Sequence, residues 1–208
     1  MQSLVTGGAG FIGSHLVDKL VKLNHQVIVL DNLSTGQLSN LDQVKNEIKF
    51  IKVDISKSGD FIHKYFSKVD WVFHIAGRAD NIPSITNPNE YFHSNVSGTL
   101  NVLEASRKAN IKKLIYAASA SCYGIPKKYP TDEKSLINLQ FPYALTKYLG
   151  EQLIVHWAKL YNMPNVSLRF FNVYGPRSNS KGAYGSVFSI FLAQKLANKP
   201  LTVVGDGN

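Results

Sequence analysis

Three glycines at a spacing of three residues separate two apolar segments near the beginning of the chain. Residues 3–6 before them read as a short strand, and residues 12–23 after them repeat apolar side chains at helical spacing. Glycines permit a tight turn and a close backbone approach, and the N-terminus of the following helix offers free N–H groups to a pyrophosphate. Gly7, Gly10 and Gly13 therefore predict a dinucleotide-binding loop, although their spacing differs from the Gly-x-Gly-x-x-Gly of typical dehydrogenases.

A carboxylate, Asp31, follows the next apolar run at residues 26–30. Its distance along the chain from the glycines is close to the roughly 20 residues expected for the acid that binds the adenosine ribose. A carboxylate at this place would repel the 2′-phosphate of NADP. We therefore expect NAD as the cofactor.

Further apolar runs occur at residues 48–53, 69–75, 113–118 and 166–170, with room for a helix between successive runs. Alternating strands and helices predict an α/β fold, a Rossmann-type doubly wound parallel sheet with helices on both faces. Ligands of such sheets bind at the carboxyl ends of the strands. The polar residues expected at those ends are Thr6, Asp31, Asp54, the 75–78 turn, Ser119 and Asn172.

Three of the polar residues have a second interpretation. Asp54 could cap a helix before Ser56. Asn95, inside a helix expected over residues 89–109, could be an ordinary polar helix residue. His74, at the end of a strand beside the 75–78 turn, fits a hydrogen-bonded core histidine better than a functional one.

Tyr143 and Lys147 stand four residues apart, directly after Pro142. Four residues make about one helical turn, so both side chains share a face of a helix in which Pro142 suits the first turn. An ammonium beside a phenol lowers the phenol pKa and makes the tyrosine a usable base near neutral pH. The pair predicts nicotinamide redox chemistry at a hydroxyl, whereas the spacing alone also fits a solvated helix face.

With these motifs the whole chain resembles the extended short-chain dehydrogenase/reductase superfamily, most closely its nucleotide-sugar epimerases of the UDP-galactose and UDP-N-acetylglucosamine 4-epimerase type. The segments that carry the resemblance are residues 5–14, 31–33, 54–55, 74–77, 95–99, 117–124, 142–147 and 169–177. Segments 78–83 and 181–188 are similar to the substrate-side loops of N-acetylhexosamine and uronic-acid epimerases.

The resemblance implies a set of residues along the NAD. They are Gly7, Gly10, Phe11, Ile12 and Gly13 at the pyrophosphate, Asp31 and Asn32 at the adenosine ribose, Asp54 and Ile55 at the adenine, and Ala76, Gly77, Asn95, Tyr143 and Lys147 along the rest of the cofactor. It implies Ser119, Tyr143 and Lys147 as the catalytic residues, and Arg78, Ser119, Ser121, Asn172 and Arg177 on the substrate side. Ser119 could instead be a strand-end cap, and Ser121 competes with it for the catalytic role.

The implied reaction is epimerisation at C4 of a UDP-hexose, UDP-N-acetylhexosamine or UDP-uronic acid through a keto sugar. Dehydration is disfavoured because Ala120 and Ser121 replace the Asp and Glu of the dehydratases. The alternatives are a related NAD-dependent reductase or decarboxylase and a nonenzymatic NAD-binding member. We expect an NAD-binding domain at residues 1–171 and the beginning of a substrate-binding domain at 172–208. Because extended members continue further, the chain is expected to be an impaired or inactive fragment.

The amino-acid composition constrains the partners and the location of the protein less strongly than the motifs do. The formal net charge of +9 fits an anionic substrate, but the basic residues are scattered, so nucleic acid is not expected as a partner. The single cysteine, Cys122, excludes an intrachain disulfide and is compatible with a reducing cytosol. Neither a signal peptide nor a membrane-length apolar run is visible, which favours a cytoplasmic location without a membrane partner. The histidine spacings predict no metal site, and a homodimer stays open.

Overall fold

The computed structural model describes residues 1–57, 60–178, 187–203 and 205–206. The chain divides into two compact units, Met1–Phe171 and Asn172–Asn208. Most of the predicted substrate-side loop at 181–188 lies outside the described residues. In the second unit, α6 spans Val187–Leu196, and the ring of Phe188 lies 5.5 Å from that of Tyr174.

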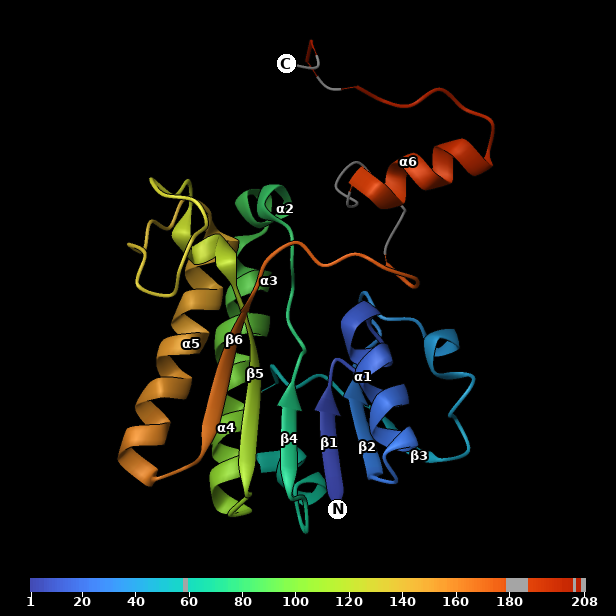
Figure 1. Ribbon diagram of the computed structural model, residues 1–208. Coiled ribbons are helices and arrows are strands. Elements are labelled where there is room, and N and C mark those ends of the chain that lie inside the picture. Colours follow the sequence, from blue (N-terminus) through green and yellow to red (C-terminus); the bar gives the residue numbers. More distant parts are fainter. Residues whose placement is uncertain (58–59, 179–186, 204, 207–208) are drawn as a thin grey trace. The chain divides into compact units, whose positions relative to one another are not determined.

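The first unit contains a six-stranded sheet in the order β3-β2-β1-β4-β5-β6 (Figure 1). Every pair of neighbouring strands is parallel. The strands are β1 Gln2–Thr6, β2 Gln26–Asp31, β3 Ile48–Lys52, β4 Trp71–His74, β5 Lys113–Ser119 and β6 Asn165–Phe170. The predicted Rossmann-type parallel sheet is confirmed.

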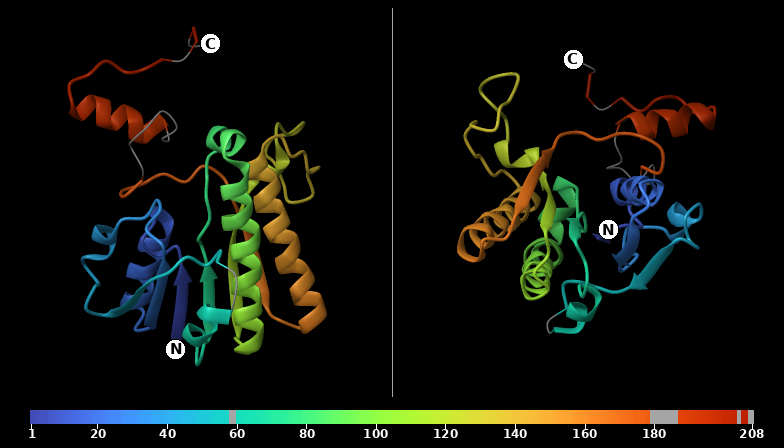
Figure 2. Two further views of the ribbon diagram at one scale, coloured as in Figure 1. Left: turned by 180° about the vertical axis from the view of Figure 1, so that it is seen from behind. Right: turned by 60° about the horizontal axis from the view of Figure 1, so that its bottom comes forward.

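Helices cover both faces of the sheet (Figure 2). Alternate residues of a strand point to opposite faces, so Leu4 of β1 packs in the cluster that contains Val102, whereas Val5 packs in the cluster that contains Val17. Val17 belongs to α1, Phe11–Lys22, and Val102 to α4, Gly98–Lys108. The long helix α5, Pro142–Tyr161, lies on the α4 face. Burial on both faces explains why the inner strands β1, β2, β4 and β5 read as continuous apolar runs.

The remaining helical segments are short. They are η1 Leu38–Leu41, η2 Asp60–Tyr65, α2 Asn81–Thr86, α3 Pro88–Phe92, η3 His93–Ser97 and η4 Ala120–Tyr123. The single helix predicted over 89–109 is therefore α3, a π-helical turn at η3, and α4. No helix in the described part of the chain combines the length and the apolar character that a membrane crossing requires.

The strand order places the turn after β1 beside the turn after β4. The chain moves outward from β1 to β3 and then returns to the other side of β1, so ligands of this topology bind where the two directions diverge. The approach there is close: a Cβ on Gly7 would lie 2.6 Å from the backbone nitrogen of Ala76. Gly7 also has φ of +71°, a conformation that favours glycine.

Candidate active site

The glycine loop is packed too tightly for side chains. A Cβ on Gly13 would lie 2.1 Å from the carbonyl oxygen of Gly7. Gly10 is the N-cap of α1; no side chain caps that helix, and its first turn, which contains Phe11 and Ile12, has no acidic residue. Backbone N–H groups and a positive helix end therefore face the carboxyl edge of the sheet, and no acidic side chain of the first turn of α1 competes for them.

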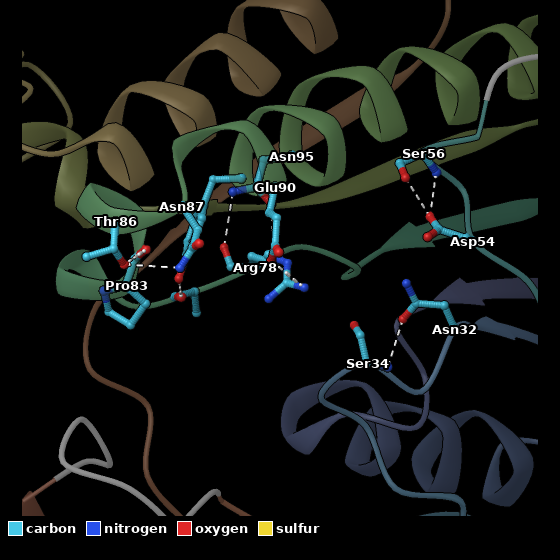
Figure 3. Close-up of polar contacts among 12 residues, drawn as sticks. Asn32, Ser34, Asp54, Ser56, Arg78, Pro83, Thr86, Asn87, Glu90 and Asn95 are labelled. Carbon is cyan, nitrogen blue, oxygen red and sulfur yellow. Dashed lines mark hydrogen bonds and ion pairs between the residues drawn. The ribbon is translucent and has the colours of Figure 1, made fainter.

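Asp31 at the end of β2 fastens the glycine loop to the sheet. One carboxylate oxygen accepts a hydrogen bond of 2.9 Å from the Ala9 backbone N–H, and the other accepts one of 2.8 Å from Leu33. Each oxygen has a further lone pair, so the carboxylate can still bind ribose hydroxyls. The neighbouring Asn32 accepts a hydrogen bond of 2.9 Å from the Ser34 N–H (Figure 3).

Asp54 follows β3 and forms a local turn with Ser56, as Figure 3 shows. Its Oδ1 accepts hydrogen bonds of 2.9 Å from the Ser56 N–H and 2.6 Å from the Ser56 hydroxyl. Burial opposes ionisation of Asp54, but these hydrogen bonds hold its pKa below the usual value. The observed motif is an Asx turn and not the cap of a helix. Ile55 is buried in the core, and its carbonyl accepts a hydrogen bond of 2.7 Å from Asn101.

Asn95 joins the turn after β4 to α5, the helix that carries Tyr143 and Lys147. Its Oδ1 accepts a hydrogen bond of 2.8 Å from the Arg78 N–H, and its Nδ2 donates to the Arg78 carbonyl at 3.1 Å (Figure 3). Nδ2 also donates at 3.1 Å to Thr146, whose hydroxyl donates at 3.0 Å to the Tyr143 carbonyl. Asn95 is buried within the π-helical turn η3 and connects segments that are distant in the sequence, while its contact with a cofactor stays a prediction.

Ser119 and Tyr143 meet at the carboxyl end of β5. The Tyr143 hydroxyl donates a hydrogen bond of 3.2 Å to Ser119 Oγ. Ser119 Oγ also accepts one of 3.2 Å from the Ser121 N–H and lies 2.8 Å from the Ser121 hydroxyl. Ser119 therefore caps η4, as the strand-end interpretation requires, and also contacts Tyr143, while its catalytic role stays a prediction. Ser121 contacts Ser119. Among the hydrogen bonds of the described residues, Ser121 is connected to Tyr143 only through Ser119.

The prediction that Lys147 lowers the pKa of Tyr143 is wrong for this structure. Burial raises the pKa of Tyr143, and Asp80 raises it further, against the hydrogen bond to Ser119. Burial also lowers the pKa of Lys147 to about 7, which the carboxylate of Glu151 opposes. Spacing on a helix shows which groups share a face, but it does not show that both groups lose water.

Lys147 lies one turn after Tyr143, in buried surroundings. Its Nζ is 4.4 Å from the centre of the Tyr116 ring. A Cβ on Gly77 would be 3.6 Å from that nitrogen. Glu151, the next acid along α5, is held by Arg169 at 2.7 Å, so much of its charge is neutralised locally.

The predicted substrate-side residues are distributed over both units. Arg78 forms an ion pair of 2.8 Å with Glu90 (Figure 3). Asn172 and Arg177 belong to the second unit, and their substrate contacts stay a prediction.

Two contacts that position Tyr143 were missed from the sequence. Ser84 in α2 accepts a hydrogen bond of 3.0 Å from the Tyr143 N–H, and Thr146 is the link to Asn95. Thr146 could have been noticed because it follows Tyr143 at the i+3 spacing of a helix. Ser84 carries no comparable signal, since its contact spans 59 residues. The described residues contain no group of three His, Cys, Asp or Glu arranged for a metal ion.

A parallel doubly wound sheet, a glycine turn at its switch point and a Ser-Tyr-Lys group beside it define a member of the short-chain dehydrogenase/reductase class. The chain belongs to the NAD dependent epimerase/dehydratase family, which matches residues 3–208. The predicted resemblance and the predicted use of NAD are thereby confirmed.

Individual relatives are nucleotide-sugar enzymes. The chain is 37% identical over 211 residues to a UDP-glucose 4-epimerase of Mycolicibacterium smegmatis, covering 100% of this chain and 67% of that protein. The crystal structure of the Thermotoga maritima UDP-glucose 4-epimerase with UDP-glucose is similar with a TM-score of 0.93 at 36% identity, covering 100% of this chain and 67% of that one. A UDP-N-acetyl-alpha-D-glucosaminuronate decarboxylase of Bacillus cytotoxicus is 34% identical over 209 residues, 98% of this chain and 64% of that protein. The chain thus spans about two thirds of the length of these relatives.

Proposed function

We propose that the whole protein epimerises a UDP-sugar at C4 through a transient keto sugar. The observation that carries this proposal is the hydrogen bond of 3.2 Å between Tyr143 and Ser119, with Lys147 one turn along the same helix. The names of the relatives from Mycolicibacterium smegmatis and Thermotoga maritima support a UDP-hexose as the substrate.

The residues at the switch point fit NAD. The cradle around Gly7 and Gly13 excludes side chains, and the uncapped α1 terminus can donate N–H groups to a pyrophosphate. We assign Gly7, Gly10, Phe11, Ile12 and Gly13 to the pyrophosphate, Asp31 and Asn32 to the adenosine ribose, Asp54 and Ile55 to the adenine, and Ala76, Gly77, Asn95, Tyr143 and Lys147 to the remainder. When bound, NAD supplies a hydride acceptor and, after the keto sugar has turned, a hydride donor.

The chain's own residues manage the proton at the sugar oxygen. In the first half-reaction, Tyr143 takes the proton of the C4 hydroxyl while Ser119 donates a hydrogen bond to the same oxygen. This step requires the phenolate of Tyr143, which the hydrogen bond with Ser119 favours against the burial that raises the pKa of Tyr143. Lys147, one turn further along α5, would bind the nicotinamide ribose. In the second half-reaction Tyr143 returns the proton to the oxygen of the keto sugar, so the reaction neither consumes nor releases a proton. Because burial raises its pKa, Tyr143 is well suited to hold this proton until the return.

The substrate-side residues follow from the same proposal. Arg78 and Ser121 would contact the sugar nucleotide together with Ser119, and Asn172 and Arg177 would bind its diphosphate side. Arg78 is available for this because its side chain is 34% exposed although it pairs with Glu90.

The experiment is a panel of UDP-sugars. The whole protein, loaded with NAD, is incubated with UDP-glucose, UDP-N-acetylglucosamine and UDP-glucuronic acid, and isomers are separated by chromatography while NADH absorbance is followed. We expect one substrate to interconvert with its 4-epimer without net NADH, and Tyr143→Phe to abolish this conversion. Release of CO2 would identify a decarboxylase, and stoichiometric change in NADH a reductase; either result would overturn the proposal.

A further inference from the structure

A buried histidine connects the end of β1 to α4. His74, the last residue of β4, is fully buried, with Nδ1 2.7 Å from the hydroxyl oxygen of Thr6 and Nε2 2.9 Å from that of Thr99. Thr6 and Thr99 are 0% and 1% exposed, so the three side chains form a hydrogen-bonded chain inside the core.

The hydrogen bonds that link Thr6, His74 and Thr99 each have a defined donor and acceptor. The Thr99 hydroxyl donates its single proton to the Asn95 carbonyl at 2.6 Å and so must accept from His74 Nε2–H. His74 Nδ1 is then the acceptor, and the Thr6 hydroxyl donates to it. Burial, assisted by the charge of Lys147, lowers the pKa of His74 to about 3, so the imidazole keeps one protonated and one bare nitrogen.

The two ends of this hydrogen-bonded network both attach to the 75–78 turn. At one end the Ala76 N–H donates to Thr6 Oγ1 at 3.3 Å. At the other, the side chain of Asn95 pairs with the backbone N–H and carbonyl of Arg78. The network is thus a ring closed by the 75–78 turn. Gly77 lies between the two attachments, where a Cβ would be 2.9 Å from Asn95 Oδ1 and 3.6 Å from Lys147 Nζ.

We propose that Thr6, His74 and Thr99 are positioning residues for the cofactor, because their ring holds the 75–78 turn with Gly77 against Lys147. The inference rests on the proposed function in that this turn lines the NAD site. A turn fixed at only one end would sample other backbone angles, and NAD would then bind to a fraction of the molecules. Thr6, His74 and Thr99 therefore determine the affinity for NAD through the position of the turn, without contacting NAD themselves.

The test compares two substitutions at one position. Thr99→Val keeps the shape of the side chain and removes the hydroxyl, whereas Thr99→Ser keeps the hydroxyl and removes a methyl group. Val102→Ala, at a fully buried position on the same helix, lowers stability without touching the ring. NAD dissociation constants are measured by calorimetry, and unfolding temperatures are measured for each variant.

We expect Thr99→Val to weaken NAD binding about tenfold, because it removes both hydrogen bonds of the Thr99 hydroxyl and so opens the ring. Thr99→Ser and Val102→Ala should stay within about twofold of the unmodified chain, although both unfold at lower temperature. Equal losses in Thr99→Val and Thr99→Ser, or a loss in Val102→Ala as large as in Thr99→Val, would show that affinity only follows stability and would overturn the inference.

A second measurement separates this inference from the proposed function. Without any nucleotide, the amide NMR signals of Ala76, Gly77 and Arg78 should move in Thr99→Val and keep their positions in Thr99→Ser. Unmoved signals in Thr99→Val would overturn the positioning role. Absence of NAD binding by the unmodified chain would instead remove the proposed cofactor site, and the amide signals would still decide whether the ring holds the turn.

Discussion

Replacing Lys147 by Met should make the protein more stable at neutral pH while removing a side chain that we assign to the NAD site. Burial lowers the pKa of Lys147 from 10.5 to about 7, so the lysine binds a proton more weakly in the folded state than in the unfolded state. Each pH unit of difference corresponds to about 1.4 kcal/mol, so Lys147 lowers the free energy of unfolding by about 4 kcal/mol at pH 7. This is an upper bound for the gain in Lys147→Met, because the contact with the Tyr116 ring is also lost.

The pH dependence has a defined sign. Between the folded and unfolded pKa values the unfolded state carries more protons, so the stability of the unmodified chain rises with pH relative to Lys147→Met. The rise should amount to about 2 kcal/mol between pH 7 and 9 and should vanish below about pH 6, where both states are protonated.

The assay is urea unfolding followed by circular dichroism, from pH 5.5 to 9, without nucleotide. Lys159→Met, at an exposed position of the same helix, controls for the loss of a lysine. Parallel curves for the unmodified chain and Lys147→Met between pH 7 and 9 would refute the reasoning, as would a variant that is less stable at pH 7.

Three further predictions concern the site. Tyr143→Phe should lower turnover of the whole protein by about 100-fold or more while NAD affinity changes little, since only the ionisable oxygen is lost; activity within a few fold would contradict the assignment. Asp31→Ala should reduce the preference for NAD over NADP in calorimetry and lower the free energy of unfolding by about 2 kcal/mol, because it also loses the hydrogen bonds from Ala9 and Leu33. Gly13→Ala should cost about 1–3 kcal/mol in denaturant unfolding and weaken NAD binding, because its Cβ would meet the Gly7 carbonyl; unchanged stability would show that the loop can move aside.

The inner strands could be predicted because they are buried on both faces, as in β1 and β2, and so read as continuous apolar runs. Runs at residues 26–30 and 48–53 correspond to β2 and β3 within one residue at each end. The strand predicted at 69–75 is shorter at both ends, because β4 extends only from Trp71 to His74, although the Ile75 N–H still donates to the Thr6 carbonyl at 3.1 Å. Continuous apolar sequence thus shows where a buried strand runs, but not where its pairing stops.

Tertiary contacts explain what the sequence could not show. The π-helical turn holds Asn95 against Arg78, 17 residues away, and no local pattern encodes that pairing. The Tyr143 and Lys147 spacing indicates a shared helix face, yet the direction of the tyrosine pKa depends on burial. Asp54 had two interpretations, and the structure shows a third local form, a turn closed by Ser56.

The π-helical turn at His93–Ser97 also constrains how the length of this segment can change. An α-helix advances about 100° per residue, so deleting one residue here would let α3 and α4 join as a regular helix but would rotate one against the other by that angle. Tyr91, whose hydroxyl donates to the Ala79 carbonyl at 2.5 Å, would swing away from its partner. A deletion of one residue would thus make this segment a regular helix, but it would change the rotation of α3 relative to α4.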